Sequence, residues 1–436
     1  MELTTGYKQT EVGVIPEDWD AVPLGKLCAF KTGPFGSALH KSDYTSGGIP
    51  LVNPMHIVDG RISPSDNMTI TAQAARKLSD FLLRRGDIVI GRRGDMGRCA
   101  VVGEAEDGWL CGTGSMIVRT VPSADPAFFQ RVLSSPPAIG KITDSSVGST
   151  MVNLNQGTLR GLVVQAPPLE EQRTIAVALS DADELIASMD TLIAKKRELK
   201  RAAMQQLLTG KTRLPGFGKG KGIKQTDLGE IPEDWCIAKV GDVLVEISMG
   251  PFGSDIKVSN FISDGVPVLS GENIRTHVLK DGFRNFVTYQ KAKSLKKAVA
   301  SRGDLVVTHR GTIGQIAYIP DSSAYENYVI SQSQFRARFK DEVKPIWVAL
   351  FFLSESGATK LLEGKGHTGV PAIAQATTTF RKLHIPLPSK DEQAAIAAVL
   401  SDMDADVANL ESQCEKARAI RQGMTQALLI GRIRLV

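Results

Sequence analysis

The sequence predicts an α+β protein that is a tandem repeat of two α/β domains with twisted sheets, joined by a long antiparallel two-helix coiled coil. Three observations predict this class. The chain has 436 residues, more than the about 250–300 that one hydrophobic core supports. Its two halves repeat the same motifs in the same order, and each half ends in a long run with helical periodicity. Hydrophobic residues make up 42% of the chain and charged residues 23%, which excludes disordered and fibrous classes.

The repeat is visible as four short motifs that occur in both halves. The matching segments, first copy and then second, are KQTEVGVIPEDW at 8–19 and KQTDLGEIPEDW at 224–235, GPFGS at 33–37 and 250–254, GDIVIGRRGDMG at 86–97 and GDLVVTHRGTIG at 303–314, and Glu-Gln at 171–172 and 392–393. Each copy is therefore the size of a domain, far longer than the about 20–50 residues of a solenoid repeat. We expect Trp19 and Trp235, at the ends of the first motif, to anchor the two cores.

The two parts of each copy differ in their residue patterns. Short β-branched runs such as 87–90 (DIVI) and 305–308 (LVVT) are separated by Gly, Pro, Asn and Asp, a pattern typical of short strands joined by turns. The last ~40 residues of each copy carry apolar residues three and four apart, as in coiled-coil helices. Acidic residues begin both runs and suit the positive end of a helix dipole, and Gly210 and Gly431 end them.

These signals divide the chain into six parts. The predicted parts are the first domain 1–166, the first helix 167–210, a linker 211–225, the second domain 226–387, the second helix 388–431 and a C-terminal tail 432–436. A helix of ~40 residues is about 60 Å long. The linker region spans at most ~55 Å when extended, so parallel helices would need a full return of the chain. Antiparallel helices need none, and they predict a dumbbell with approximate two-fold symmetry.

The predicted helices also offer apolar residues for the coiled-coil stripe and for partner proteins. These residues are Leu185, Met189, Leu192, Leu199, Met403, Val407, Leu410 and Met424. Apolar residues beyond the mutual stripe are expected to carry a partner interface.

The catalytic and metal-binding motifs that we considered are all incomplete. Residues 210–212 (GKT) are only the tail of a phosphate-binding loop, and 135–138 (SPPA) lack the aromatic residue of an adenine methyltransferase motif. Residues 198–200 (ELK) resemble a nuclease motif but lie on the predicted coiled coil. The six histidines form no HExxH or HxH, and the five cysteines form no CxxC. We therefore expect no catalytic residue, no metal site and no cofactor in this chain.

Charge and hydropathy limit the cellular compartment and the binding partners that we expect. No apolar run reaches the ~20 residues of a membrane helix and the first nine residues are polar, so we expect a cytoplasmic protein with free thiols. The net charge of +5 permits nucleic-acid binding. Basic residues cluster in 76–98, 195–224 and 291–302. Such clusters either neutralise phosphates or simply keep the surface solvated.

Two basic pairs are more specific, because each follows an apolar strand and leads into Gly-x-x-Gly. They are Arg92-Arg93 and His309-Arg310. Such a loop can present a long side chain from a rigid strand end, where Arg can bind guanine; alternatively, its glycines only satisfy backbone angles. GPFGS is either a tight turn with its Phe tucked in or a DNA-contacting loop. The candidate DNA-binding residues are Lys31, Lys41, Arg92, Arg93, Arg98, Asn153, Asn155, Lys257, Arg275, His309, Arg310, Gln315, Lys365 and His367.

The openings KQTEVGVIPEDW and KQTDLGEIPEDW, the paired GPFGS and the Pro-Pro-Leu-Glu-Glu-Gln helix start resemble the DNA specificity subunit of type I restriction–modification systems. The resemblance covers essentially the whole chain. It implies two target-recognition domains, an antiparallel coiled coil and no catalysis by this subunit. It also implies double-stranded DNA, two methyltransferase subunits and restriction/translocase subunits as partners. S-adenosylmethionine would bind the methyltransferase, and ATP and Mg the nuclease subunit.

Two other functions stay open from the sequence. One is a stand-alone DNA-modifying enzyme, a nuclease or methyltransferase, which would need several hundred further residues. The other is a non-catalytic scaffold whose domains bind protein rather than DNA. In the specificity-subunit interpretation, each domain reads one half of a bipartite target and the helices set the spacer between them. Domains that differ within one chain then imply an asymmetric target.

Overall fold

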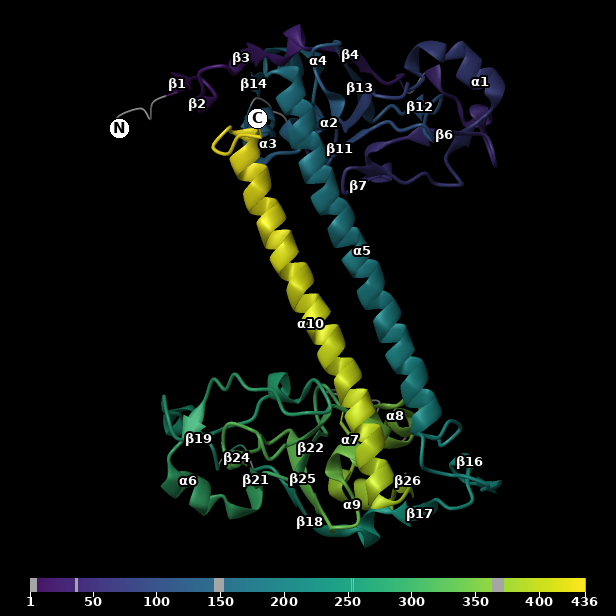
Figure 1. Ribbon diagram of the computed structural model, residues 1–436, viewed down its shortest axis with the longest axis vertical. Coiled ribbons are helices and arrows are strands. Elements are labelled where there is room, and N and C mark those ends of the chain that lie inside the picture. The colour runs from purple at the N-terminus through teal and green to yellow at the C-terminus, as the bar shows by residue number, and fades with distance from the viewer. Residues whose placement is uncertain are drawn as a thin grey trace. The chain divides into compact units, whose positions relative to one another are not determined.

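The structure is a computed structural model that describes residues 6–35, 38–144, 153–251, 253, 255–362 and 372–435 (Figure 1). The chain forms two compact units, Met1–Met189 with Gln413–Val436, and Asp190–Ser412. The first unit thus contains the first β-rich domain, the start of the first long helix and the end of the second. The second unit contains the end of the first helix, the second domain and the start of the second helix.

Short strands and helices alternate in the first domain, as the turn-rich sequence predicts. Its strands are β1 Tyr7–Thr10, β2 Gly13–Pro16, β3 Asp20–Pro23, β4 Cys28–Thr32, β5 Tyr44–Thr45, β6 Ile49–Val52, β7 Ile57–Val58, β8 Arg61–Ile62, β9 Thr69–Ile70, β10 Ile88–Gly91, β11 Cys99–Val101, β12 Leu110–Cys111, β13 Ser115–Thr120 and β14 Val163–Ala166. Its helices are α1 Ala72–Lys77, α2 Pro126–Leu133, α3 Pro136–Asp144 and α4 Gln156–Gly161, and α5 Leu169–Leu207 follows.

The second domain repeats this order. Its strands are β15 Ile223–Thr226, β16 Gly229–Pro232, β17 Cys236–Lys239, β18 Leu244–Met249, β19 Val266–Pro267, β20 Phe286–Val287, β21 Val299–Ser301, β22 Leu305–Thr308, β23 Ile316–Tyr318, β24 Asn327–Val329, β25 Gln334–Phe339 and β26 His384–Leu387. Its helices are α6 Tyr289–Ser294, α7 Pro345–Leu353, α8 Glu355–Leu362 and α9 Ala376–Lys382, and α10 Lys390–Leu429 follows. Short 3-10 turns, among them η5 Ser79–Phe81, η8 Gly271–Ile274 and η9 Lys296–Ala298, connect these elements.

The central antiparallel sheet has the same strand order in both domains. The order is β11-β10-β13-β4 in the first domain and β23-β22-β25-β18 in the second. β10 and β22 are buried along their whole length. Both faces of these strands are covered, which is why their sequences are continuously apolar rather than alternating. Trp19 and Trp235 are fully buried in the cores of their units, which confirms their predicted role as anchors.

The two long helices pair in antiparallel fashion, as the sequence predicts. In the first unit, Asp183 near the start of α5 binds Arg421 near the end of α10, with Nε and Oδ1 2.8 Å apart. In the second unit, Lys196 near the end of α5 lies 3.2 Å from Asp406 near the start of α10. Helices of 39 and 40 residues agree with the predicted length.

The predicted stripe on α5, which Ile186 and Ile193 widen, is buried through these two isoleucines and not through its leucines. Leu185, Leu192 and Leu199 are exposed, by 57%, 42% and 51%. Instead Ile193 is buried and Ile186 half-buried, one position further along the chain. The two apolar rows have the same seven-residue spacing and lie about 100° apart on the helix, so periodicity alone does not choose between them. Of the other predicted stripe residues, Val407 is buried, and Met189, Met403, Leu410 and Met424 are half-buried.

A polar contact ties the second domain to the helices of its own unit. His277 is buried between the domain and α10. Its Nε2 lies 3.1 Å from Ser401 Oγ, and its Nδ1 lies 3.0 Å from Asp404 Oδ2. Lys200 of α5 also binds Asp404. Because Asp404 is shared with Lys200, we interpret this Ser–His–Asp contact as a structural tie rather than as a catalytic group.

This tie predicts an acid-sensitive contribution to the stability of the second unit. Burial alone would raise the pKa of Asp404, but hydrogen bonds from His277 and Lys200 outweigh it and hold that pKa below its usual 3.8. The resulting stabilisation is present above the unfolded-state pKa and is lost as pH falls through the lower pKa of the folded state. Urea unfolding between about pH 4 and pH 2 should therefore show a shallower loss of stability in Asp404→Asn than in the wild type.

The matched control for this prediction is Asp406→Asn, which removes a more exposed ion pair with Lys196 from the same helix. Exposed pairs contribute little, so this variant should keep nearly the wild-type pH profile. If the stability of Asp404→Asn fell with pH as steeply as that of the wild type, this role of Asp404 would be contradicted.

Candidate nucleic-acid interface

The ends of the central strands meet at one edge of each domain, which we call the loop edge. In the first domain it comprises residues 32–35, 53–56, 91–98, 112–115 and 153–156, and in the second domain residues 249–251, 270–274, 308–315, 331–334 and 372–375. The same backbone hydrogen bonds hold both edges together. They are Gly33 N to Ser115 O and Gly250 N to Gln334 O, Arg92 N to Gly114 O and His309 N to Ser333 O, and Leu154 N to Arg92 O and Ile373 N to His309 O, all 2.8–3.0 Å long.

The first glycine of GPFGS is required by a close approach between backbones at this edge. A Cβ on Gly33 would lie 1.9 Å from the carbonyl oxygen of Gly112, and one on Gly250 would lie 1.9 Å from that of Ser331. Phe35 is 77% exposed, which excludes for this ring the alternative of a tight turn with the Phe tucked in. Phe252, its counterpart, lies outside the described residues. The motif therefore shapes the loop edge and, in the first domain, presents an exposed ring there.

The Gly-x-x-Gly loops are built by glycine backbone conformations. Gly94 and Gly97 have φ of 79° and 83°, and Gly311 and Gly314 have φ of 83° and 84°. These values lie in the left-handed region that side chains disfavour. The glycines therefore satisfy the turn, and the turn leaves the second basic residue of each pair exposed.

Each basic pair divides into one inward and one outward residue. Arg92 Nε donates to the carbonyl oxygen of Leu154 at 3.0 Å, and burial lowers the pKa of Arg92. His309 Nε2 lies 3.3 Å from the carbonyl oxygen of Gln332, and burial likewise lowers the pKa of His309. Arg93 and Arg310 are exposed. The outward residues are therefore the ones free to contact a ligand.

Other candidates in the first domain are engaged in local contacts. Arg98 forms an ion pair with Asp95. Asn155 caps α4 by accepting a hydrogen bond from the Thr158 amide at 2.9 Å. Asn153 is exposed beside it. Lys31 lies in β4 directly before the loop edge, and its side chain forms an ion pair with Asp80.

In the second domain, the structure places Gln315 on the loop edge together with His309 and Arg310, and Gln315 is half-buried. Lys257 and Arg275 are exposed, on the segments that follow GPFGS and η8. Lys365, His367 and the side chain of Lys41 lie outside the described part of the chain. The loop edges thus gather eight of the predicted residues: Arg92, Arg93, Arg98, Asn153, Asn155, His309, Arg310 and Gln315.

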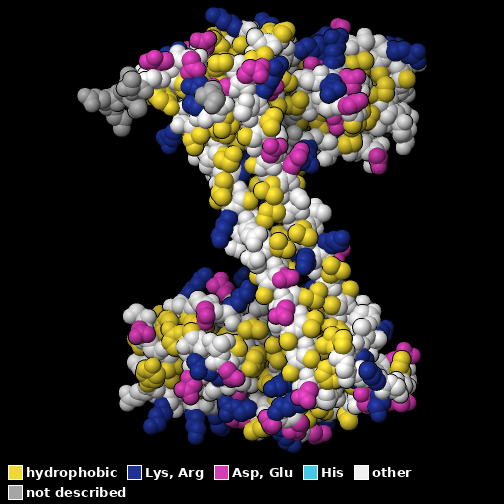
Figure 2. Space-filling view, in the orientation of Figure 1, with side chains coloured by type: hydrophobic (Ala, Val, Ile, Leu, Met, Phe, Trp, Pro, Cys, Tyr) yellow, Lys and Arg dark blue, Asp and Glu magenta, His cyan; other side chains and the backbone are white. Residues whose placement is uncertain are grey.

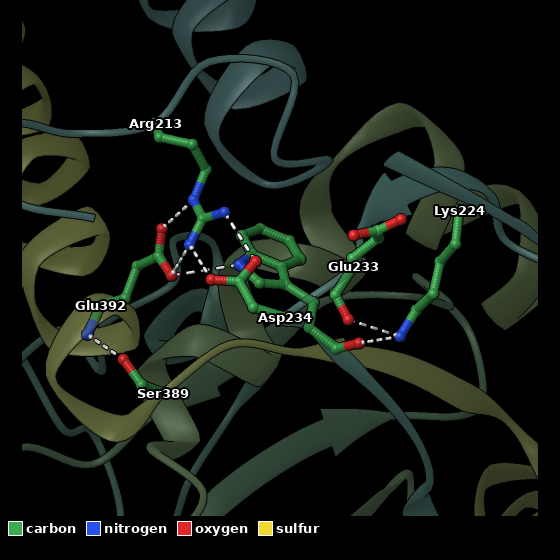
Figure 3. A network of polar contacts seen from close by, with 7 residues as sticks. Arg213, Lys224, Glu233, Asp234, Ser389 and Glu392 are labelled. Atoms are coloured by element: carbon green, nitrogen blue, oxygen red, sulfur yellow. Dashed lines mark hydrogen bonds and ion pairs between the residues drawn. The ribbon is translucent and has the colours of Figure 1, made fainter. Parts of the chain in front are cut away.

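A charged cluster, which we call the clasp, fixes the second domain to the start of α10 (Figure 3). Glu392 is buried and receives bonds from Arg213 Nε at 2.5 Å and from Trp235 Nε1 at 3.1 Å. Arg213 also binds Asp234 through two bonds of 2.9 and 3.0 Å, and hydrogen bonds from Arg213 lower the pKa of Asp234. Lys224 donates to the carbonyl oxygens of Glu233 and Trp235. The cluster thus joins IPEDW to the Glu-Gln helix start.

The first unit has an equivalent clasp. Trp19 Nε1 donates to buried Glu171 at 2.8 Å, and Arg434 binds both Glu171 and Asp18. Sequence analysis missed the two arginines, although GKTRL at 210–214 and GRIRL at 431–435 carry them at the same distance from the glycine that ends each helix. The repeated IPEDW and Glu-Gln motifs are therefore explained by packing of the domain onto a helix, not by ligand binding.

The described residues contain neither a metal-binding cluster nor a membrane-spanning helix. No group of three or more His, Cys, Asp or Glu side chains there is placed to hold a metal ion. No described helix has the length and apolar character needed to cross a membrane.

Duplicated domains that present an exposed arginine from equivalent loops, each followed by a long helix, define a two-module recognition protein. The family described as type I restriction modification DNA specificity domain matches residues 16–196 and again residues 232–417. The chain belongs to this family, the specificity subunits of type I restriction–modification systems.

Individual relatives agree with this assignment over most of their length. The type I restriction enzyme MjaVIII specificity subunit of Methanocaldococcus jannaschii is 25% identical over 430 residues, which cover 97% of this chain and 94% of that protein. The EcoBI specificity subunit of Escherichia coli is 23% identical and covers 90% of this chain and 81% of its own. The crystal structure of a type I S subunit from M. genitalium has the same fold, with a TM-score of 0.57 at 14% identity and 98% of both chains covered.

Proposed function

We propose that each domain of this specificity subunit reads one half of a bipartite, asymmetric DNA target through its loop edge. The observation that carries the proposal is the equivalent exposure of Arg93 and Arg310 on glycine-shaped loops that are held by the same backbone hydrogen bonds. An arginine presented from a rigid strand end can bind guanine O6 and N7 in the major groove. The two edges differ in their remaining side chains, so the two halves of the target would differ as well.

The chain would supply recognition and leave chemistry to its partners. Two methyltransferase subunits would dock on the helices, where Leu185, Leu192 and Leu199 form an exposed apolar row on α5. Those subunits would bring S-adenosylmethionine. Restriction/translocase subunits would bring ATP and Mg, and this chain itself would be non-catalytic.

The helices would set the spacer between the two halves of the target. Half-sites about one helical turn, ~34 Å, apart face the same side of the duplex. The length of α5 and α10 would then determine the spacer, and the loop edges would determine the bases read.

The test is co-expression with a methyltransferase subunit of the same restriction–modification system, followed by mapping of methylated adenines in the host DNA. The expected result is one asymmetric, bipartite motif with methyladenine in both halves. A stable complex that adds no new motif would contradict the proposal and favour a scaffold. Methylation by the purified chain alone would instead favour a stand-alone enzyme.

A further inference from the structure

A row of lysines follows the α6–η9 segment of the second domain, and we call it the lysine ridge. It consists of Lys291, Lys293, Lys296 and Lys297. The segment 289–302 contains no Asp or Glu. Lys293, Lys296 and Lys297 are exposed, and none of the ion pairs between described residues uses a ridge ammonium group. Figure 2 shows Lys and Arg side chains gathered at the lower left, where Figure 1 draws α6.

The first domain carries a different arrangement at the equivalent place. Asp80 lies seven residues before Asp87, as Lys297 lies seven before Asp304. Lys31 Nζ is 2.9 Å from Asp80 Oδ2 and 5.0 Å from the ring centroid of Phe81. The first domain therefore has a carboxylate paired with a lysine where the second domain has Lys297, although Arg76 and Lys77 nearby are exposed as well.

A buried arginine holds the ridge in position. Arg336 of β25 lies opposite Val306 of β22 in the second domain. The equivalent pair in the first domain is Ile117 of β13 opposite Val89 of β10. The second domain therefore has a buried arginine where the first domain has a buried isoleucine. Arg336 Nε donates to the carbonyl oxygen of Lys297 at 3.2 Å, and its Nη2 binds Glu246 at 2.6 Å. The turn that presents Lys296 and Lys297 is thus fixed to the sheet.

The ridge lies beside the loop edge across a groove. The groove has a volume of about 850 Å³ and is lined by Met249–Pro251 on one side and by Ser294–Ala298 on the other. Two carboxylates also line it, those of Glu246 and Asp255. Arg336 neutralises Glu246 and lowers its pKa. Lys296 and Lys297 are exposed where they line this groove, and Asp255 adds one further carboxylate to the lining.

We propose that the lysine ridge binds the DNA phosphate backbone that flanks the second half-site and supplies sequence-independent affinity there. This inference rests on the proposed DNA recognition and adds a contact outside the loop edge. Ammonium groups without protein partners bind phosphates as point charges and carry no base information. Release of counterions then makes their contribution strongly dependent on salt.

The test uses the full chain in complex with its methyltransferase and two duplexes, one with the mapped target and one with both halves scrambled. The triple variant Lys293→Gln/Lys296→Gln/Lys297→Gln should lose affinity by a similar factor on both duplexes, about tenfold or more near 0.1 M salt. The slope of log K against log salt should become shallower by about 2–3. The methylated motif should stay unchanged.

Two controls separate charge from folding and one domain from the other. The triple variant with Arg at the same three positions keeps the charge and should keep the salt slope. Arg76→Gln/Lys77→Gln removes two charges from the corresponding helix, α1, of the first domain, and its change of slope for each charge removed is the comparison for that domain. Wild-type affinity and slope in the Gln triple variant would overturn the inference, as would a changed motif, and both leave the proposed function standing. A wild-type complex that binds both duplexes equally would overturn the proposed function itself.

Discussion

Glu392→Ala should lower the free energy of unfolding of the second unit by about 3–5 kcal/mol, the usual cost of removing one partner from a buried ion pair. The Arg213 side chain is only 15% exposed, so the variant leaves its guanidinium largely buried with Asp234 as its remaining acidic partner. It also removes the acceptor of the indole N–H of Trp235. Urea unfolding followed by Trp fluorescence measures the change.

Glu392→Gln is the informative comparison, because it keeps an acceptor for Trp235 and loses only the charge. We expect it to be destabilised less than Glu392→Ala. Glu171→Ala removes the equivalent carboxylate and should weaken the first unit through Arg434 and Trp19 in the same way. A loss below about 1 kcal/mol for Glu392→Ala would show that the clasp behaves as an ordinary surface ion pair.

Arg93→Ala and Arg310→Ala should each relax one half of the DNA target and leave the other half intact. A bidentate arginine–guanine contact contributes about 1–3 kcal/mol of discrimination, roughly fivefold to 150-fold in relative affinity. Each variant is co-expressed with the methyltransferase, and the methylated motif is mapped. We expect a degenerate position in one half with Arg93→Ala and in the other half with Arg310→Ala.

The matched control is Arg61→Ala, an exposed arginine of β8 outside the loop edge, which should leave both halves unchanged. Arg92→Ala differs in kind, because Arg92 donates to the Leu154 carbonyl and should act by loosening the loop edge. An unchanged motif with both Arg93→Ala and Arg310→Ala would show that other loop-edge side chains carry the base readout.

The sequence by itself determined the duplicated architecture, the two long helices and the buried tryptophans. These features are encoded locally, because strand and helix periods, turn residues and repeated motifs are readable without knowledge of long-range contacts. It also located the loop edges, since Gly-x-x-Gly after an apolar strand specifies a turn wherever the strand ends. Which side chain of each basic pair faces outward was not encoded in this way.

Only the tertiary structure decided the features that depend on distant segments. The coiled-coil face of α5 depends on where α10 lies, and it selected Ile186 and Ile193 over the equally periodic Leu185 and Leu192. The clasp joins Arg213 to Glu392, 179 positions apart. The lysine ridge owes its fixed position to Arg336, 39 positions from Lys297. In each case a side chain acquires its role from a partner that local sequence patterns do not specify.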